Sequence, residues 1–210
     1  MGSIIRSFII LIFFHFSFSL AFGDSFEKSW FKGEIVLTDG NILKGKINYN
    51  INTKIVRLKT GSKVKAFTPY SVSYFTFFDQ IKEKERVFTS QNFIEKIGLV
   101  NSTFLELLID GPIVVLRDGE YVSFNTQTSH HDGAFKAFYY VNVNEKIYIV
   151  KDFKKDVMPF MISYESKINS FIQEQRINLT KPNHQILLID YFNHLVDPEY
   201  QWIGRNTDLD

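Results

Sequence analysis

The 210-residue sequence contains no cysteine, and this absence excludes several kinds of protein. Disulfide bonds cannot form, so an exported form of this chain must be held together by packing alone. A bacterial lipid anchor attached to cysteine is likewise not expected. At this length, and with 45% hydrophobic residues, the chain can bury the core of one or two small domains.

Sequence motifs of common enzymes are also missing. The 11 glycines are dispersed, so there is no glycine-rich loop to bind phosphate, and no Gly-x-Ser-x-Gly motif presents a serine nucleophile. No period of fixed length indicates a solenoid. The sequence does not decide whether the protein is an enzyme, but these absences favour a non-enzymatic role without a cofactor.

The N-terminal residues have the composition of an export signal. Arg6 precedes an apolar run from Phe8 to Phe22, and Gly23 ends a site with small residues. We expect residues 1–23 to be a signal peptide that is cleaved after Gly23, which predicts a secreted or periplasmic protein without a transmembrane span after cleavage. The alternative is an uncleaved membrane anchor, for which the apolar run is short. Loss of Arg6 would leave equal numbers of basic and acidic residues.

Alternation of apolar and polar residues between Phe31 and Asp79 predicts five short strands. The runs are rich in β-branched and aromatic residues, which suit a pleated surface. Turn pairs such as Asp39-Gly40 and Gly61-Ser62 separate them. Short connections of this kind favour an antiparallel sheet, because parallel strands need crossover helices.

A second meander is predicted between Thr103 and Val150. Its turns are expected at Asp118-Gly119 and Asn144-Glu145. Between the meanders, the charged segment Ile81 to Arg86 predicts an exposed turn, and the sequence does not decide whether Val87 to Ile94 forms a strand. The two meanders predict either two stacked sheets or one curled sheet.

The C-terminal part of the chain predicts two helices. Ser163 is expected to cap the first, whose apolar face contains Ile168, Phe171 and Ile172. Pro182 suits the first turn of the second helix, where a missing N–H costs nothing.

Together these patterns predict an α+β fold, mainly β: an antiparallel meander with a C-terminal helical hairpin. The expected organisation is a β domain over 24–151, a helical hairpin packed on the sheet over 152–203, and a flexible tail over 204–210.

Basic residues accumulate in the first meander, where no Asp or Glu occurs between Asn41 and Phe78. We predict that six of them form a binding site: Lys44, Lys46, Arg57, Lys59, Lys63 and Lys65. Such a face would bind an anionic envelope component or a protein partner. Nucleic acid is not expected as a partner, because the chain carries an export signal. The simpler interpretation is a solvated face whose lysines discourage aggregation between strands.

Two other functions stay open. A small apolar ligand or lipid would need a cavity lined by aromatic residues. The candidates for that lining are Tyr70, Tyr74, Phe75, Phe77, Phe78, Phe138, Tyr139 and Tyr140. A hydrolase would need convergence of Asp110, Asp118, Glu120, His130 and His131. No metal site is expected, because His130-His131-Asp132 lacks the spacing of zinc ligands and His184 and His194 are ten residues apart.

The segments GEIVLTDGNILKGKI (Gly33 to Ile47) and FIQEQRINLTKPNHQILLIDYFNHL (Phe171 to Leu195) resemble a group of exported bacterial β-rich proteins of unknown function. In that group a lysine-rich β meander precedes a helical hairpin. The resemblance covers the two ends of the chain only. It implies no activity and assigns no site residue.

Overall fold

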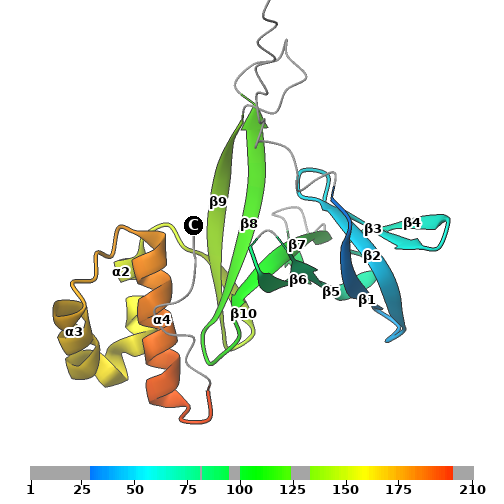
Figure 1. Cartoon of the computed structure of the whole chain (residues 1–210). Coiled ribbons are helices and arrows are strands. Elements are labelled where there is room, and N and C mark those ends of the chain that lie inside the picture. Colours follow the sequence, from blue (N-terminus) through cyan, green and yellow to red (C-terminus); the bar gives the residue numbers. More distant parts are fainter. Residues whose placement is uncertain (1–28, 81, 95–99, 124–132, 201–210) are drawn as a thin grey trace, which may run out of the picture.

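The computed structural model describes residues 29–80, 82–94, 100–123 and 133–200. Ten antiparallel strands form one open sheet with the order β10-β9-β8-β7-β6-β5-β1-β2-β3-β4, and helices follow the last strand. The helices lie at one end of the sheet and the first meander at the other (Figure 1). The predicted fold class is confirmed, and the sheet is single rather than a sandwich. Residues 1–28, which include the expected signal peptide, lie outside the described residues.

The five strands predicted between Phe31 and Asp79 are present. Their bounds are β1 Phe31–Leu37, β2 Ile42–Asn50, β3 Ile55–Thr60, β4 Lys63–Phe67 and β5 Val72–Asp79. Gly40 has a φ of 85° and Gly61 a φ of 61°, which few other residues adopt without strain. The turn residues therefore place the hairpins where the sequence predicts them.

The chain order and the spatial order of the strands differ at β5. This strand pairs with β1 instead of β4, so β1 lies between β2 and β5 inside the sheet. Gly33 is the residue that allows the pairing, because a Cβ at this position would lie 2.1 Å from the backbone oxygen of Thr76. The first meander is therefore joined to the second through β5, which pairs with β1 on one side and with β6 on the other.

The second meander comprises β6 Lys84–Ile94, β7 Val100–Ile109, β8 Val114–Ser123, β9 Gly133–Val143 and β10 Lys146–Ile149. The undecided segment after Val87 is thus a strand. The predicted turn at Asn144-Glu145 is present, and both residues have positive φ values of 50° and 65°. The turn predicted at Asp118-Gly119 is wrong, because these residues lie inside β8. A Cβ on Gly119 would lie 2.3 Å from the tip of the exposed Phe135 ring, so a larger residue at this position would displace that ring.

The segment Ile81 to Arg86 is only partly the exposed turn that the sequence predicts. Strand β6 begins at Lys84, and Arg86 is buried on the face of the sheet that also carries Phe88. The prediction fails because a run of charges is usually solvated, whereas Arg86 has buried acidic partners from other strands.

The C-terminal part contains more helix than predicted. Its elements are α2 Phe153–Asp156, the 3-10 helix η1 Met158–Tyr164, α3 Glu165–Glu174 and α4 Pro182–Val196. Ser163 does not cap α3, because the 3-10 helix runs through it and Tyr164 precedes α3. Pro182 begins α4 as predicted, and Ile168 and Phe171 are buried.

Two separate hydrophobic clusters hold the fold. The first lies inside the curl of the sheet, where the ring of Phe75 stacks on Phe88 at 4.9 Å and meets the edge of Phe104 at 5.0 Å. The second lies between β7–β9 and the helices, where residues such as Val141 pack with Leu188. The sheet therefore has one hydrophobic core at each end, and the residues between the two cores join them.

Candidate functional site

Strand register divides the six predicted basic residues between the two faces of the first meander. Buried Ile47, Val56 and Leu58 define its core face, and the opposite face is called the outer face. Lys44, Lys46, Arg57 and Lys59 alternate with these residues and therefore lie on the outer face. Lys65 is paired with Leu58 and Lys63 with Thr60, so both belong to the core-face side of edge strand β4. The prediction that all six share one binding face does not fit this register.

A row of three lysines crosses the outer face. Lys32 on β1 is directly opposite Lys46 on β2, and Lys46 is directly opposite Lys59 on β3. All three side chains are exposed. Neighbouring strands are about 4.8 Å apart, so the row places three positive charges along roughly 10 Å. Directly opposed like charges destabilise a sheet, and this arrangement therefore costs the free protein stability.

Lys32 was not among the predicted residues, because it lies on the far side of Asp39 from the other lysines. The sequence does contain a signal for it, because Lys32, Glu34 and Val36 alternate with Gly33, Ile35 and Leu37. The missing information was the register between β1 and β2, which fixes Lys32 beside Lys46 rather than beside Lys44.

Trp30 lies next to the lysine row. The Nζ atom of Lys59 lies 5.9 Å from the centre of its ring, within the range of a cation–π contact. The segment before β1 is tied to β2, because Nδ2 of Asn48 donates to the backbone oxygen of Ser29 at 2.9 Å. Arg57 is directly opposite Asn48. We call Trp30, Lys32, Lys46, Arg57 and Lys59 the basic face.

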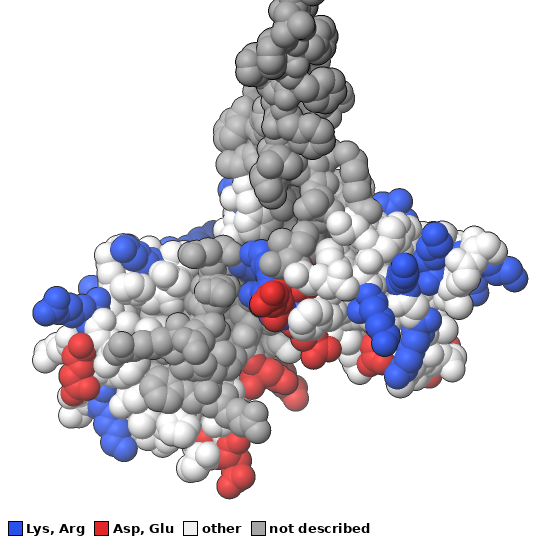
Figure 2. All heavy atoms as spheres, viewed as in Figure 1, with Lys and Arg blue, Asp and Glu red and all other residues white. Residues whose placement is uncertain are grey.

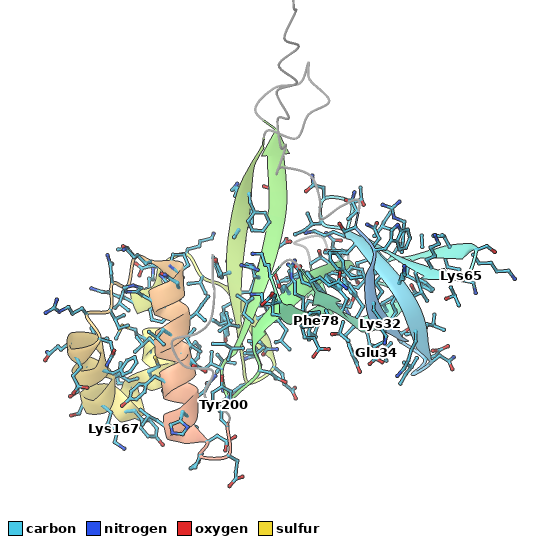
Figure 3. All side chains as sticks on the ribbon, viewed as in Figure 1. Lys32, Glu34, Lys65, Phe78, Lys167 and Tyr200 are labelled. Atoms are coloured by element: carbon cyan, nitrogen blue, oxygen red, sulfur yellow. The ribbon has the colours of Figure 1, made fainter. Side chains whose placement is uncertain are left out.

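Lys44 differs from the lysines of the row. Its Nζ lies 3.3 Å from an oxygen of Glu34, which is directly opposite it on β1. Figure 3 shows Glu34 close to Lys32 on β1 and Lys65 farther out, at the edge of the sheet. Figure 2 shows basic side chains gathered over the end of the molecule that holds the first meander. Because Lys44 is paired with Glu34, it adds less to the positive charge of this end than the lysines of the row do.

A buried ionic network lies between the two hydrophobic clusters. Glu106 on β7 accepts from Arg86 at 2.7 and 2.9 Å and from Arg117 on β8 at 2.7 and 3.2 Å. Arg86 also pairs with Asp79 at 3.5 Å, and its guanidinium lies 5.0 Å from the ring of Phe88. The network therefore touches the aromatic cluster directly.

Electrostatics keep this network charged. Burial opposes ionisation of Glu106, but hydrogen bonds and positive charge from Arg86 and Arg117 outweigh it, so the pKa of Glu106 lies below its ordinary value. Burial also opposes the charge of Arg117, and Glu106 outweighs that effect and raises the pKa of Arg117. The described part of the network balances two arginines with two carboxylates.

Tyr49 stands beside the network with a buried hydroxyl. Its oxygen has no hydrogen-bond partner within the described ranges, and burial raises its pKa strongly. The space between Tyr49, Phe88, Phe104 and Arg117 is too small for a water molecule. This interior is filled, so it offers no described cavity for an apolar ligand.

The eight aromatic residues proposed as a cavity lining do not share one space. Phe75 and Phe77 are buried in the aromatic cluster, whereas Tyr70, Tyr74 and Phe78 are exposed. Phe138, Tyr139 and Tyr140 lie on β9 and are half-buried. Their distribution follows the ordinary packing of a curled sheet.

The carboxylates considered for hydrolysis have separate partners or positions. Asp118 pairs with Lys54, and Glu120 lies 3.8 Å from Lys136. Asp110 follows the end of β7, in the connection to β8. His130 and His131 lie outside the described residues.

Metal-ligating side chains do not gather within the described part of the chain, where no group of three or more His, Asp or Glu side chains could hold a metal ion. His184 has a structural contact, since its Nδ1 accepts from the backbone N–H of Asn178 at 2.7 Å.

None of the helices in the described ranges is long and apolar enough to cross a membrane. Comparisons with protein-family models, with curated proteins and with solved structures find no match.

Proposed function

We propose that this protein is an exported, non-enzymatic binding protein that attaches to a polyanionic component of the cell envelope through its basic face. The observation that carries the proposal is the row formed by Lys32, Lys46 and Lys59. Opposed lysines repel one another in the free protein, and a bound polyanion removes that cost. The affinity is therefore expected to rise with the number of negative charges that the partner places against the row.

The surroundings of the row suit an extended anionic partner. Arg57 adds a second type of donor, one that can bind phosphate or carboxylate through two parallel hydrogen bonds. Trp30 adds a large amphipathic ring at the edge of the charges, as is common where proteins meet a membrane interface or a sugar chain. Lys44 contributes less in this proposal, because Glu34 already offsets its charge.

The test compares two variants with the same change in net charge. Lys32→Glu/Lys46→Glu/Lys59→Glu reverses the row, and Lys151→Glu/Lys154→Glu/Lys155→Glu reverses three exposed lysines near the start of the helical part. Binding is measured by co-sedimentation with vesicles containing phosphatidylglycerol and by elution from heparin. Vesicles of phosphatidylcholine serve as the neutral comparison.

The row variant is expected to lose about tenfold or more in affinity, and the helical variant much less, because charges beyond a screening length of about 8 Å contribute little at physiological salt. A Trp202→Phe background leaves Trp30 as the single tryptophan, and its emission should change on binding. Preference for vesicles or for heparin distinguishes a lipid from a glycan. Equal losses in both variants, or no binding to either probe, would contradict the proposal.

A further inference from the structure

The core face of β6 and β7 changes from apolar to polar residues near one end of the curled sheet. Phe88 and Phe104 are buried there, but the next residues on the same face are Ser90, Asn92 and Ser102. Strand register places Ser90 opposite Phe104, and Asn92 opposite Ser102. Apolar residues would be expected to continue the core. The polar residues instead form the floor of an open groove of about 480 Å³.

The groove is built from five parts of the chain, of which β6 and β7 supply the floor. Thr38 follows β1, Tyr70 lies in the connection between β4 and β5, and Ser73 comes from β5. The described lining contains hydroxyl, amide and apolar groups but no charged side chain. A volume of this size falls within the usual range of small-molecule sites.

The hydroxyl protons of the three serines in the lining are already used by the protein. Ser102 donates to Oδ1 of Asn92 at 2.6 Å, Ser90 donates to the backbone oxygen of Pro69, and Ser73 donates to the backbone oxygen of Leu37 at 3.3 Å. The serine oxygens therefore present lone pairs rather than protons. Because Oδ1 of Asn92 accepts from Ser102, its amide NH₂ group remains as a donor.

This arrangement selects the chemistry of a ligand. Phosphate and carboxylate groups bring acceptors only, and they would meet three serine oxygens that also act as acceptors, with the Asn92 amide as the donor to offset them. A cationic ligand brings donors, but no carboxylate in the described lining would balance its charge. A neutral polyol brings several O–H donors together with acceptors. Tyr70, whose side chain is 63% exposed, adds a ring on which an apolar sugar face can lie.

We propose that the groove lined by Thr38, Tyr70, Ser73, Ser90, Asn92 and Ser102 is a binding site for a neutral saccharide. The site is independent of the basic face, because the residues of the groove lie on or beside the core face, whereas the lysine row is on the outer face. The full-length protein would thus hold two sites of different chemistry.

The test uses neutral oligosaccharides as probes: maltotriose, cellotriose and N-acetylchitotriose. Binding to the full-length protein is followed by saturation-transfer NMR and calorimetry. At least one probe should bind with a Kd of about 1 mM or tighter. Tyr70→Ala and Asn92→Ala should each weaken that binding about tenfold. Tyr74→Ala is the matched control, because Tyr74 is also exposed but is paired with Val36 on the outer face.

Several outcomes would overturn the inference. The first is that none of the three probes binds. The second is that the Tyr70→Ala/Asn92→Ala double variant, with unchanged thermal unfolding, binds as tightly as the parent protein. The third is that Tyr74→Ala weakens binding as much as Tyr70→Ala does. The variant with the lysine row reversed should retain saccharide binding. A parallel loss in that variant would place the sugar on the basic face and would also overturn the groove as the site.

Discussion

Asn193 on α4 holds Ile113 by both of its backbone polar groups. Its Oδ1 accepts from the N–H of Ile113 at 2.8 Å, and its Nδ2 donates to the carbonyl oxygen at 2.9 Å. Asn193 is fully buried, and a Cβ on Gly111 would lie 2.6 Å from its Nδ2. These two hydrogen bonds therefore join the last helix to the connection between β7 and β8.

Replacement of Asn193 by Ala is expected to lower the free energy of unfolding by about 2–4 kcal/mol, because two buried backbone groups lose their partners. Urea denaturation followed by circular dichroism measures the change. Asn169→Ala on the exposed side of α3 is the control and should change stability by less than about 0.5 kcal/mol. Equal effects of the two substitutions would show that the contact to Ile113 does not hold the helix.

Glu106→Gln is expected to lower the free energy of unfolding by more than a Glu→Gln substitution at an exposed position does. Without the carboxylate, Arg86 and Arg117 are left buried with less negative charge than positive charge, which costs about 3–5 kcal/mol. Glu120→Gln changes an exposed carboxylate on the neighbouring strand and should be nearly neutral. Chemical denaturation of both variants at pH 7 checks the prediction, and a stability of Glu106→Gln close to that of the parent would contradict it.

The same carboxylate should make the fold sensitive to acid. The pKa of Glu106 is lower in the folded chain than its ordinary value of 4.5, so it binds a proton more readily when unfolded. Its contribution to stability is therefore present above about pH 4.5 and is lost as the pH falls toward the folded value. The unfolding free energy of the parent should drop over that range, and that of Glu106→Gln should drop less. Parallel pH profiles would assign the acid sensitivity to other groups.

Removal of the hydroxyl group is expected to change stability in opposite directions at Tyr49 and Tyr200. Tyr49→Phe removes a buried oxygen that has no partner among the described residues, so stability should stay the same or rise by about 0.5–1 kcal/mol. Tyr200→Phe removes a donor to buried Asp190 at 2.6 Å and should cost about 1–3 kcal/mol. Thermal unfolding compares the two variants. A clear loss in Tyr49→Phe would indicate a hydrogen bond that the described residues do not provide.

The first meander could be predicted from the sequence because its signals are local. Alternating residues and turn pairs such as Asp39-Gly40 fix strands and hairpins without reference to the rest of the chain. The pairing of β1 with β5 and the buried position of Arg86 depend on residues far apart in sequence. No local pattern carries that information, and the same holds for the opposition of Lys32 and Lys46, which only the strand register determines.

The Asp118-Gly119 pair shows why a turn signal can mislead. Asp-Gly favours a tight hairpin when the backbone is unconstrained. In β8 the pair has another use, since Asp118 binds Lys54 and Gly119 leaves room for the ring of Phe135. The composition is the same in the two cases, and only the neighbours that approach from other strands distinguish them.

The position of β1 inside the sheet has a consequence for how the protein is made. A chain that emerges N-terminus first presents β1 at once, but its second neighbour, β5, follows only after three other strands. During that interval the row of backbone N–H and C=O groups facing β5 is open to any extended peptide nearby. Correct folding of this protein therefore depends on keeping that edge of β1 apart from other chains until Val72–Asp79 has been synthesised.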